Sequence, residues 1–208
     1  MLPGETLDRL SADELRGQLH CAVIGHQITV LEQTSSTNDA ILQAATANPN
    51  EGFVLFAERQ TAGRGQRGNR WESASGKGLW FSILLRPEIE INDSARLTIW
   101  AIEAISDVIR TELSLEPTIK LPNDIQVHGR KVAGVLVEMR AQEKATHLAI
   151  VGIGINVNQS LQDFPPELRN RAISLAMALH RPVDRQKFAV AILRNLDRNY
   201  RARFAPKH

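Results

Sequence analysis

One segment of the sequence has a composition suited to holding an anion. Residues 61–71 read TAGRGQRGNRW, with three glycines and three arginines. Glycines let the backbone approach a ligand and expose its N–H groups, and arginines supply forked donors for carboxylate or phosphate oxygens. The segment lacks the Gly-Lys-Ser/Thr ending of a P-loop. It therefore indicates a loop that wraps an anionic ligand, with a solvated surface loop or a weak RNA contact as the alternative.

A second candidate site lies around Lys131. The preceding residues 120–124, KLPND, favour a turn because Asn and Asp follow a proline. Lys131 then opens the apolar run 132–139 after a His128-Gly129 turn. A lysine at the mouth of an apolar strand either extends to solvent or faces an anion, and the residues alone leave both interpretations open.

Two further segments complete the candidates. Residues 151–157, VGIGINV, place glycines in an apolar strand, which permits close approach of a ligand or of another backbone. They lack the third glycine and the following helix of a dinucleotide-binding fingerprint. Residues 34–38, TSSTN, carry hydroxyls that either cap a helix or bind a polar ligand group.

The elements that must position these residues mix helices with strands. Leu97, Trp100 and Ile105 share one helix face and make 94–114 the longest predicted helix. Further helices are predicted after Ser11, at 37–47 and at 184–203, and strands at 28–32, 52–58, 79–85, 118–121, 124–128, 131–139 and 147–153. The order predicts an α/β (α+β) fold with a mixed, hairpin-rich sheet flanked by helices.

Composition narrows the class of protein. The 208 residues are 43% hydrophobic, which suits a single globular domain over 1–208 with a real core. The formal net charge is only +2, so a general nucleic-acid binder is disfavoured and DNA is not an expected partner. The one cysteine, Cys21, cannot form an internal disulfide, and no Cys/His cluster has zinc spacing, so no metal-ligating residue is expected.

The sequence also bears on the compartment. The first residues, MLPGETLDRL, have neither the basic nor the apolar region of a secretory signal. No apolar run reaches the roughly 18 residues that a membrane span needs. We therefore expect a cytoplasmic protein in a reducing compartment with no membrane partner.

The order of the candidate motifs carries more information than any one of them. Along the chain, the sequence shows in turn Ser36-Thr37-Asn38, Gln60 with Gly63-Arg64-Gly65, Arg67-Gly68 and Trp71, Lys120 with Pro122-Asn123-Asp124, Gly129-Arg130-Lys131 with Ala133-Gly134 and Leu136-Val137-Glu138, and Gly152-Ile-Gly154-Ile-Asn156. Over roughly residues 28–160 this series resembles the catalytic domain of the biotin protein ligases, an α/β fold related to the lipoate ligases.

The resemblance implies an enzyme that adenylates biotin with ATP to biotinyl-5'-AMP. The biotinyl group would then pass to a specific lysine of a biotin carboxyl carrier protein, as in acetyl-CoA carboxylase. ATP, biotin and the Mg²⁺ that accompanies ATP are the implied cofactors. A homodimer stays open, because the sequence does not determine the oligomeric state.

The resemblance also implies roles for individual residues. Those implied to carry the chemistry are Arg64, Lys131 and Asp124. Those implied to bind biotin are Ser36, Thr37, Gln60, Gly63, Arg64, Lys131, Gly134, Leu136, Gly152 and Gly154. Those implied to bind the nucleotide are Arg67, Trp71, Asn123 and Asn156, with Trp71 also closing the loop over the intermediate.

The sequence departs from the family pattern in several places. Because few residues precede residue 28, we expect no helix-turn-helix domain, and we expect the small β-barrel that often follows the catalytic domain to be absent. The family usually has Trp and Arg where this chain has Leu121 and Gln66.

The sequence leaves two alternative functions open. A lipoate or octanoate ligase would share the fold, but Cys21, the only candidate for a cysteine nucleophile, lies outside every motif. A non-catalytic biotin sensor would not need Arg64, Lys131 and Asp124, all of which are retained.

Overall fold

A seven-stranded sheet organises the molecule. The structure is a computed structural model that describes residues 8–45, 50–142 and 147–204. The strand order is β1-β2-β3-β7-β6-β5-β4, where β1 and β2 pair in parallel and all other neighbours are antiparallel. The strands are β1 (Ile28–Thr34), β2 (Val54–Gln60), β3 (Gly78–Leu85), β4 (Thr118–Lys120), β5 (Asp124–Val127), β6 (Arg130–Arg140) and β7 (Leu148–Asn156). The prediction of a mixed, hairpin-rich sheet is confirmed.

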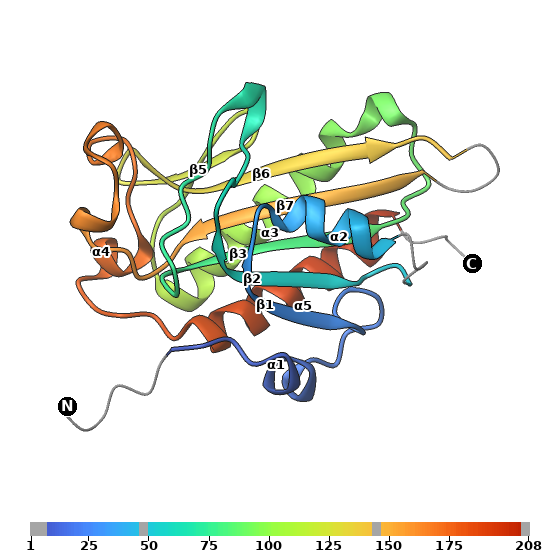
Figure 1. The fold of residues 1–208 in the computed structure, drawn as a ribbon, viewed down its shortest axis with the longest axis horizontal. Coiled ribbons are helices and arrows are strands. Elements are labelled where there is room, and N and C mark those ends of the chain that lie inside the picture. Colours follow the sequence, from blue (N-terminus) through green and yellow to red (C-terminus); the bar gives the residue numbers. More distant parts are fainter. Residues whose placement is uncertain (1–7, 46–49, 143–146, 205–208) are drawn as a thin grey trace.

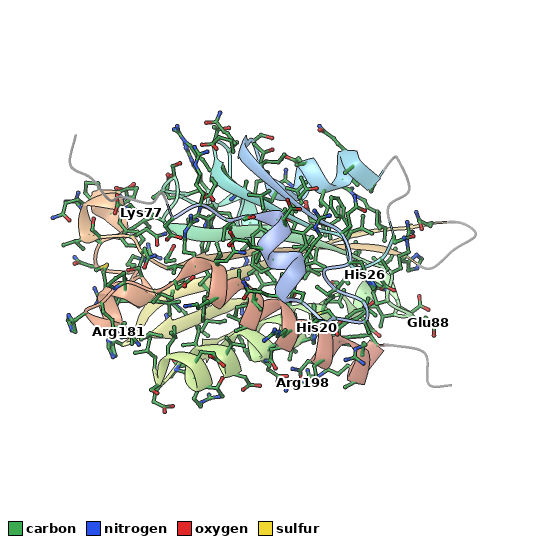
Figure 2. The ribbon with its side chains drawn as sticks, turned by 90° about the horizontal axis from the view of Figure 1, so that it is seen from below. His20, His26, Lys77, Glu88, Arg181 and Arg198 are labelled. Atoms are coloured by element: carbon green, nitrogen blue, oxygen red, sulfur yellow. The ribbon has the colours of Figure 1, made fainter. Side chains whose placement is uncertain are left out.

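Helices cover the two faces of the sheet unequally. They are α1 (Ala12–Gln18), α2 (Thr37–Ala45), α3 (Ala95–Leu113), α4 (Leu175–Leu179) and α5 (Arg185–Phe204), with short 3-10 turns at Gln66–Gly68, Ile91–Asp93, Leu161–Asp163 and Pro166–Leu168. Figure 1 shows α2 in front of the sheet and α3 and α5 behind it. Seen from below in Figure 2, α3 and α5 lie side by side beneath the strands.

Residues alternate between the two faces along β7. Val151, Ile153 and Ile155 belong to the large core that includes the buried sides of α3 and α5. Ile150 packs in a smaller core with Ile41 of α2. Because strand side chains alternate, Gly152 and Gly154 fall on the same face as Ile150. We call this face of the sheet the α2 face, and the opposite face the α3/α5 face.

Most predicted elements form, with shifted boundaries. Ser11 caps α1 through the backbone N–H of Glu14, as the sequence indicated. The predicted strand 52–58 forms at 54–60 and so includes Gln60, and β7 runs three residues beyond its predicted end. Residues 46–47, the predicted end of the second helix, lie outside the described residues.

The stretch between β7 and α5 was not predicted. It forms two 3-10 turns and α4, which Ser174 caps through the N–H of Met177. In Figure 1 this stretch lies at the end of the sheet where β7 finishes. Two backbone hydrogen bonds join this stretch to β6. Lys131 N donates to Arg171 O, and Ile173 N donates to Lys131 O. Long-range backbone pairing fixes this segment, and no local periodicity announces it.

Candidate functional site

Three glycines open a cavity on the α2 face. Gly134 pairs with Gly154 across β6 and β7, and Gly152 lies two residues earlier on β7. The cavity measures about 40 Å³. It is lined by Ser36, Thr37, Asn38, Gln60, Arg64, Gly65, Trp71, Asn123, Lys131, Gly134, Val135, Leu136, Gly152, Ile153 and Gly154. All four motif segments therefore meet at one place, although they are spread over more than half of the chain.

Buried polar groups form the floor of this cavity. The N–H and hydroxyl of Thr37 donate to Gln60 Oε1 at 2.9 and 3.2 Å, and Gln60 Nε2 donates to Ser73 Oγ at 3.0 Å. The hydroxyl of Ser82 lies 2.8 Å from Thr37 Oγ1 and 2.6 Å from Asn38 Oδ1. The hydroxyls that could have been simple helix caps belong to a buried network that faces the cavity.

The glycines make room for side chains as well as for a ligand. A Cβ added at Gly152 would clash with the Asn38 amide, and one added at Gly154 would overlap the Trp71 indole. At Gly134 an added Cβ would come within 3.0 Å of the same indole. Gly63, which does not line the cavity, would meet the carbonyl oxygen of Trp71. The Trp71 ring thus occupies part of the space that the glycines leave.

The 61–71 loop folds back on itself as a small hairpin. Trp71 N donates to Gly63 O at 2.9 Å, and Gly65 N donates to Asn69 O at 2.7 Å. At its tip, Arg67 and Gly68 adopt positive φ angles of 57° and 77°. Arg67 is exposed and is not among the residues that line either cavity of the site, so its nucleotide contact stays a prediction.

Arg64 ties the loop to the body of the protein. One guanidinium nitrogen lies 2.5 Å from Asp39 Oδ1, and the other lies 3.0 and 3.2 Å from the two carboxylate oxygens of Glu138. The hydrogen bond to Asp39, followed by the charge of Glu138, raises the pKa of Arg64 above its ordinary value against the opposing effect of burial.

Lys131 stands between this cavity and a second, larger one. Its ammonium lies 2.6 Å from Asp124 Oδ1 and 5.1 Å from the centre of the Trp71 ring. The second cavity measures about 460 Å³. It is lined by Asn69, Arg70, Trp71, Glu72, Lys120, Asp124, Gln126, Gly129, Lys131, Asn156, Phe164, Leu168, Asn170, Arg171 and Ala172. Trp71 and Lys131 line both cavities, so the two cavities meet at these side chains.

A β-bulge directs Lys131 into the site. Gln126 pairs with Lys131 and Ile125 pairs with Ala133, so Val132 is an extra residue in β6. An extra residue shifts the alternation of side chains, which places Lys131 on the same face as Gly134 three positions later. An added Cβ at Gly134 would indeed lie 3.1 Å from the Lys131 ammonium. Of the two interpretations left open for Lys131, the structure supports the one that faces the site.

The two predicted nucleotide-binding asparagines have different surroundings. Asn123 lines the first cavity, and its side-chain amide donates to Val135 O at 3.0 Å. Asn156 lines the second cavity, where its amide donates to Ile173 O and accepts from Gln159. Asn156 therefore anchors the stretch that follows β7.

Sequence reasoning missed several residues of the site. Ser82 hydrogen-bonds to Thr37 and Asn38, which line the first cavity; it is the one polar side chain of the strand sequence GLWFSILL, and that isolation was a usable signal. Asp39 and Glu138 were not recognised as partners of Arg64. Lys120, Phe164 and Arg171 line the second cavity, and no local pattern marked Phe164 or Arg171.

The described residues bear on metals and membranes as well. No group of three or more His, Cys, Asp or Glu side chains in the described ranges could hold a metal ion. Among helices in the part of the chain that the structure describes, none combines the length and the apolar character needed to cross a bilayer.

Comparisons with known proteins show which family the chain resembles in sequence. Residues 30–156 match the Biotin/lipoate A/B protein ligase family. The chain is 38% identical over 193 residues to the bifunctional ligase/repressor BirA of Bacillus spizizenii, covering 93% of this chain and 59% of that protein. It is 32% identical over 194 residues to the biotin–[acetyl-CoA-carboxylase] ligase of Mycobacterium tuberculosis, covering 90% of this chain and 70% of that protein.

A solved structure shares the fold. The biotin protein ligase of Aquifex aeolicus in complex with biotin and ATP superposes with a TM-score of 0.72 at 30% identity, covering 86% of this chain and 74% of that chain.

Proposed function

The chain belongs to the biotin/lipoate A/B protein ligase family, and from this premise we propose that it adenylates biotin and transfers the biotinyl group to a lysine of a biotin carboxyl carrier domain. The observation that carries the proposal is the meeting of two cavities at Lys131. One cavity has a polar floor and glycine walls, and the other is bordered by cations. A reaction between a small acid and a nucleotide needs two such compartments with a cation between them.

The first cavity suits a bicyclic ligand with one polar edge. Thr37, Gln60 and Asn38 offer donors and acceptors at the floor for the ureido ring, and the strands at Gly134 and Gly154 leave space for the hydrocarbon chain. The volume of about 40 Å³ is far below the few hundred Å³ of a ligand site. Binding therefore requires Trp71 to leave the glycines that it now covers.

Lys131 would serve the chemical step. The biotin carboxylate attacks the α-phosphorus of ATP, pyrophosphate leaves, and a mixed anhydride forms. The attack brings two anions together, and a cation held between them offsets the repulsion. Asp124 holds the ammonium of Lys131 in place. In the transfer step the carrier lysine attacks the acyl carbon and AMP leaves.

The nucleotide fits the second cavity. Its cations Arg70, Lys120 and Arg171 suit phosphate oxygens, and Phe164 and Leu168 offer an apolar surface for a base. Mg²⁺ would arrive with ATP as part of the substrate, since the described side chains offer Asp124 and Glu72 at this cavity and no acidic cluster.

Isotope exchange between pyrophosphate and ATP tests the proposal. We expect exchange that depends on biotin, followed by transfer of biotin to a carrier domain. Exchange that depends on lipoate or octanoate in place of biotin would identify the related ligase. Binding of biotin with no exchange for any acid would identify a sensor.

A further inference from the structure

The guanidinium of Arg64 has its charge satisfied within the protein. Asp39 comes from the first turn of α2, and Glu138 comes from β6, so the two carboxylates approach from different elements. Both ion pairs are short, at 2.5 and 3.0 Å. Two carboxylates around one guanidinium leave a local excess of one negative charge, which disfavours a further anion at this position.

Glu138 continues the network towards the floor of the first cavity. Its second partner is Asn38, whose amide nitrogen donates to Glu138 Oε2 at 2.7 Å. The amide oxygen of Asn38 lies 2.6 Å from the fully buried hydroxyl of Ser82. Asn38 itself is 4% exposed and occupies the space beside Gly152. The loop arginine is therefore connected through Glu138 and Asn38 to the groups that line the floor.

We propose that Arg64 is a positioning residue that fastens the 61–71 loop over the first cavity, and that Asp39 and Glu138 are its anchors. Only the identity of the ligand in this proposal rests on the proposed function. Arg64 holds the loop, and the ligand carboxylate goes to Lys131. The planar fork of arginine can bridge two carboxylates at once, which the single ammonium of a lysine does less well.

The geometry separates Arg64 from Lys131. Within the described residues Lys131 has one carboxylate partner, Asp124, and it lies at the junction of the two cavities. Arg64 has two carboxylate partners, and it lines the first cavity but not the second. A ligand carboxylate that bound Arg64 would compete with two carboxylates, Asp39 and Glu138, for this cation. At Lys131 it would compete with one, Asp124.

An uncharged analogue of biotin distinguishes a fastening residue from a carboxylate ligand. The probes are biotin and biotinol, in which an alcohol replaces the carboxylate. We expect Arg64→Gln to weaken both by the same factor, about three- to tenfold, because it loosens the loop. Lys131→Gln is the matched comparison and should weaken biotin much more than biotinol. A loss confined to biotin in Arg64→Gln would overturn the proposal.

The anchors are tested by a double-mutant cycle. Glu138→Gln keeps an oxygen that can accept from Asn38 but removes the charge that faces Arg64. We expect Glu138→Gln and Arg64→Gln each to weaken biotinol binding, and the double variant to weaken it little more than either alone. Full additivity of the two losses would contradict the pairing. Asp39→Asn gives the same test for the second anchor, and thermal unfolding checks that each variant is folded.

Hydrogen exchange of the ligand-free protein gives a readout that does not depend on biotin. We expect the amides of residues 63–71 to exchange about three- to tenfold faster in Arg64→Gln, and partly so in Asp39→Asn and Glu138→Gln. Arg70→Gln is the control, since the side chain of Arg70 pairs, among the described residues, with Glu72 and Thr61 close by in the chain. Unchanged exchange in Arg64→Gln would overturn the proposal. If the native protein bound neither biotin nor biotinol, the proposed function would fail while this measurement still decided the role of Arg64.

Discussion

The two faces of the sheet use the same strands for different purposes. On the α3/α5 face, β7 presents Val151, Ile153 and Ile155, which two long helices bury completely or nearly so. On the α2 face the same strand presents Gly152 and Gly154, and the nine-residue helix α2 packs its apolar side chains in a smaller core with Leu55, Leu84, Leu148 and Ile150. Stability is concentrated on one face, and the other is left open for a ligand under a loop in place of a helix.

The largest expected effect is the loss of adenylation rate when Lys131, on the α2 face, is replaced. Lys131→Ala should lower the rate of biotin adenylation by about two to three orders of magnitude, because it removes the cation between two reacting anions. Single-turnover formation of biotinyl-adenylate measures the effect, and thermal unfolding should show little change. Near-native turnover in the variant would remove Lys131 from the reaction and weaken the view that the open face carries it.

Neighbouring residues of β7 test the comparison directly. Ile155→Ala should lower the free energy of unfolding by about 2–5 kcal/mol, because it leaves a cavity in the α3/α5 core, while biotin affinity of the folded protein stays close to native. Gly154→Ala should do the reverse. Its methyl group occupies space that Trp71 now fills and that biotin needs once Trp71 has moved, so biotin should bind about tenfold more weakly with a small change in stability.

Denaturant unfolding and calorimetric titration of biotin measure this pair of variants. The comparison between the faces fails if Gly154→Ala unfolds the protein, or if Ile155→Ala selectively removes binding.

A smaller effect concerns the cover of the open face. Gln66 begins the turn at the tip of the loop, where the family usually has arginine. Gln66→Arg should slow the dissociation of biotinyl-adenylate by about tenfold, because arginine adds a charge-assisted donor for the phosphate. Gln66→Glu is the control of opposite charge and should speed release. Equal or faster release from the arginine variant would contradict the prediction.

The smallest expected effect is the change in amide hydrogen exchange of the 61–71 loop when ligand binds. Beyond Ala62, whose backbone still bonds to Ser35, the loop is held by Trp71, by partly exposed side-chain ion pairs and by a short hairpin, so the amides of residues 63–71 should exchange readily in the ligand-free protein. Biotin or biotinyl-adenylate should slow that exchange several-fold, while the amides of β7 on the core side stay equally protected. Equal exchange of the loop with and without ligand would show that the cover is already fixed.

Much of the fold could be predicted because local signals were strong. The apolar spacing in 94–114 and the apolar run in 147–153 identified α3 and most of β7, and Ser11 marked the start of α1. The stretch between β7 and α5 could not be predicted, since backbone bonds to Lys131 organise it. The gathering of the motifs at one cavity followed from their resemblance to a family, and their spacing alone did not imply it.

The sequence by itself determined which residues are available to each face. Glycines at 152 and 154 within an apolar strand remove side chains from one face wherever that strand is placed, because strand residues alternate. Tertiary structure decided what fills the resulting space. The bulge at Val132 turned Lys131 towards the site, and the strand order brought Glu138 to Arg64, 74 residues away in the chain. Such pairings depend on sheet order and register, which a linear pattern of residue types does not encode.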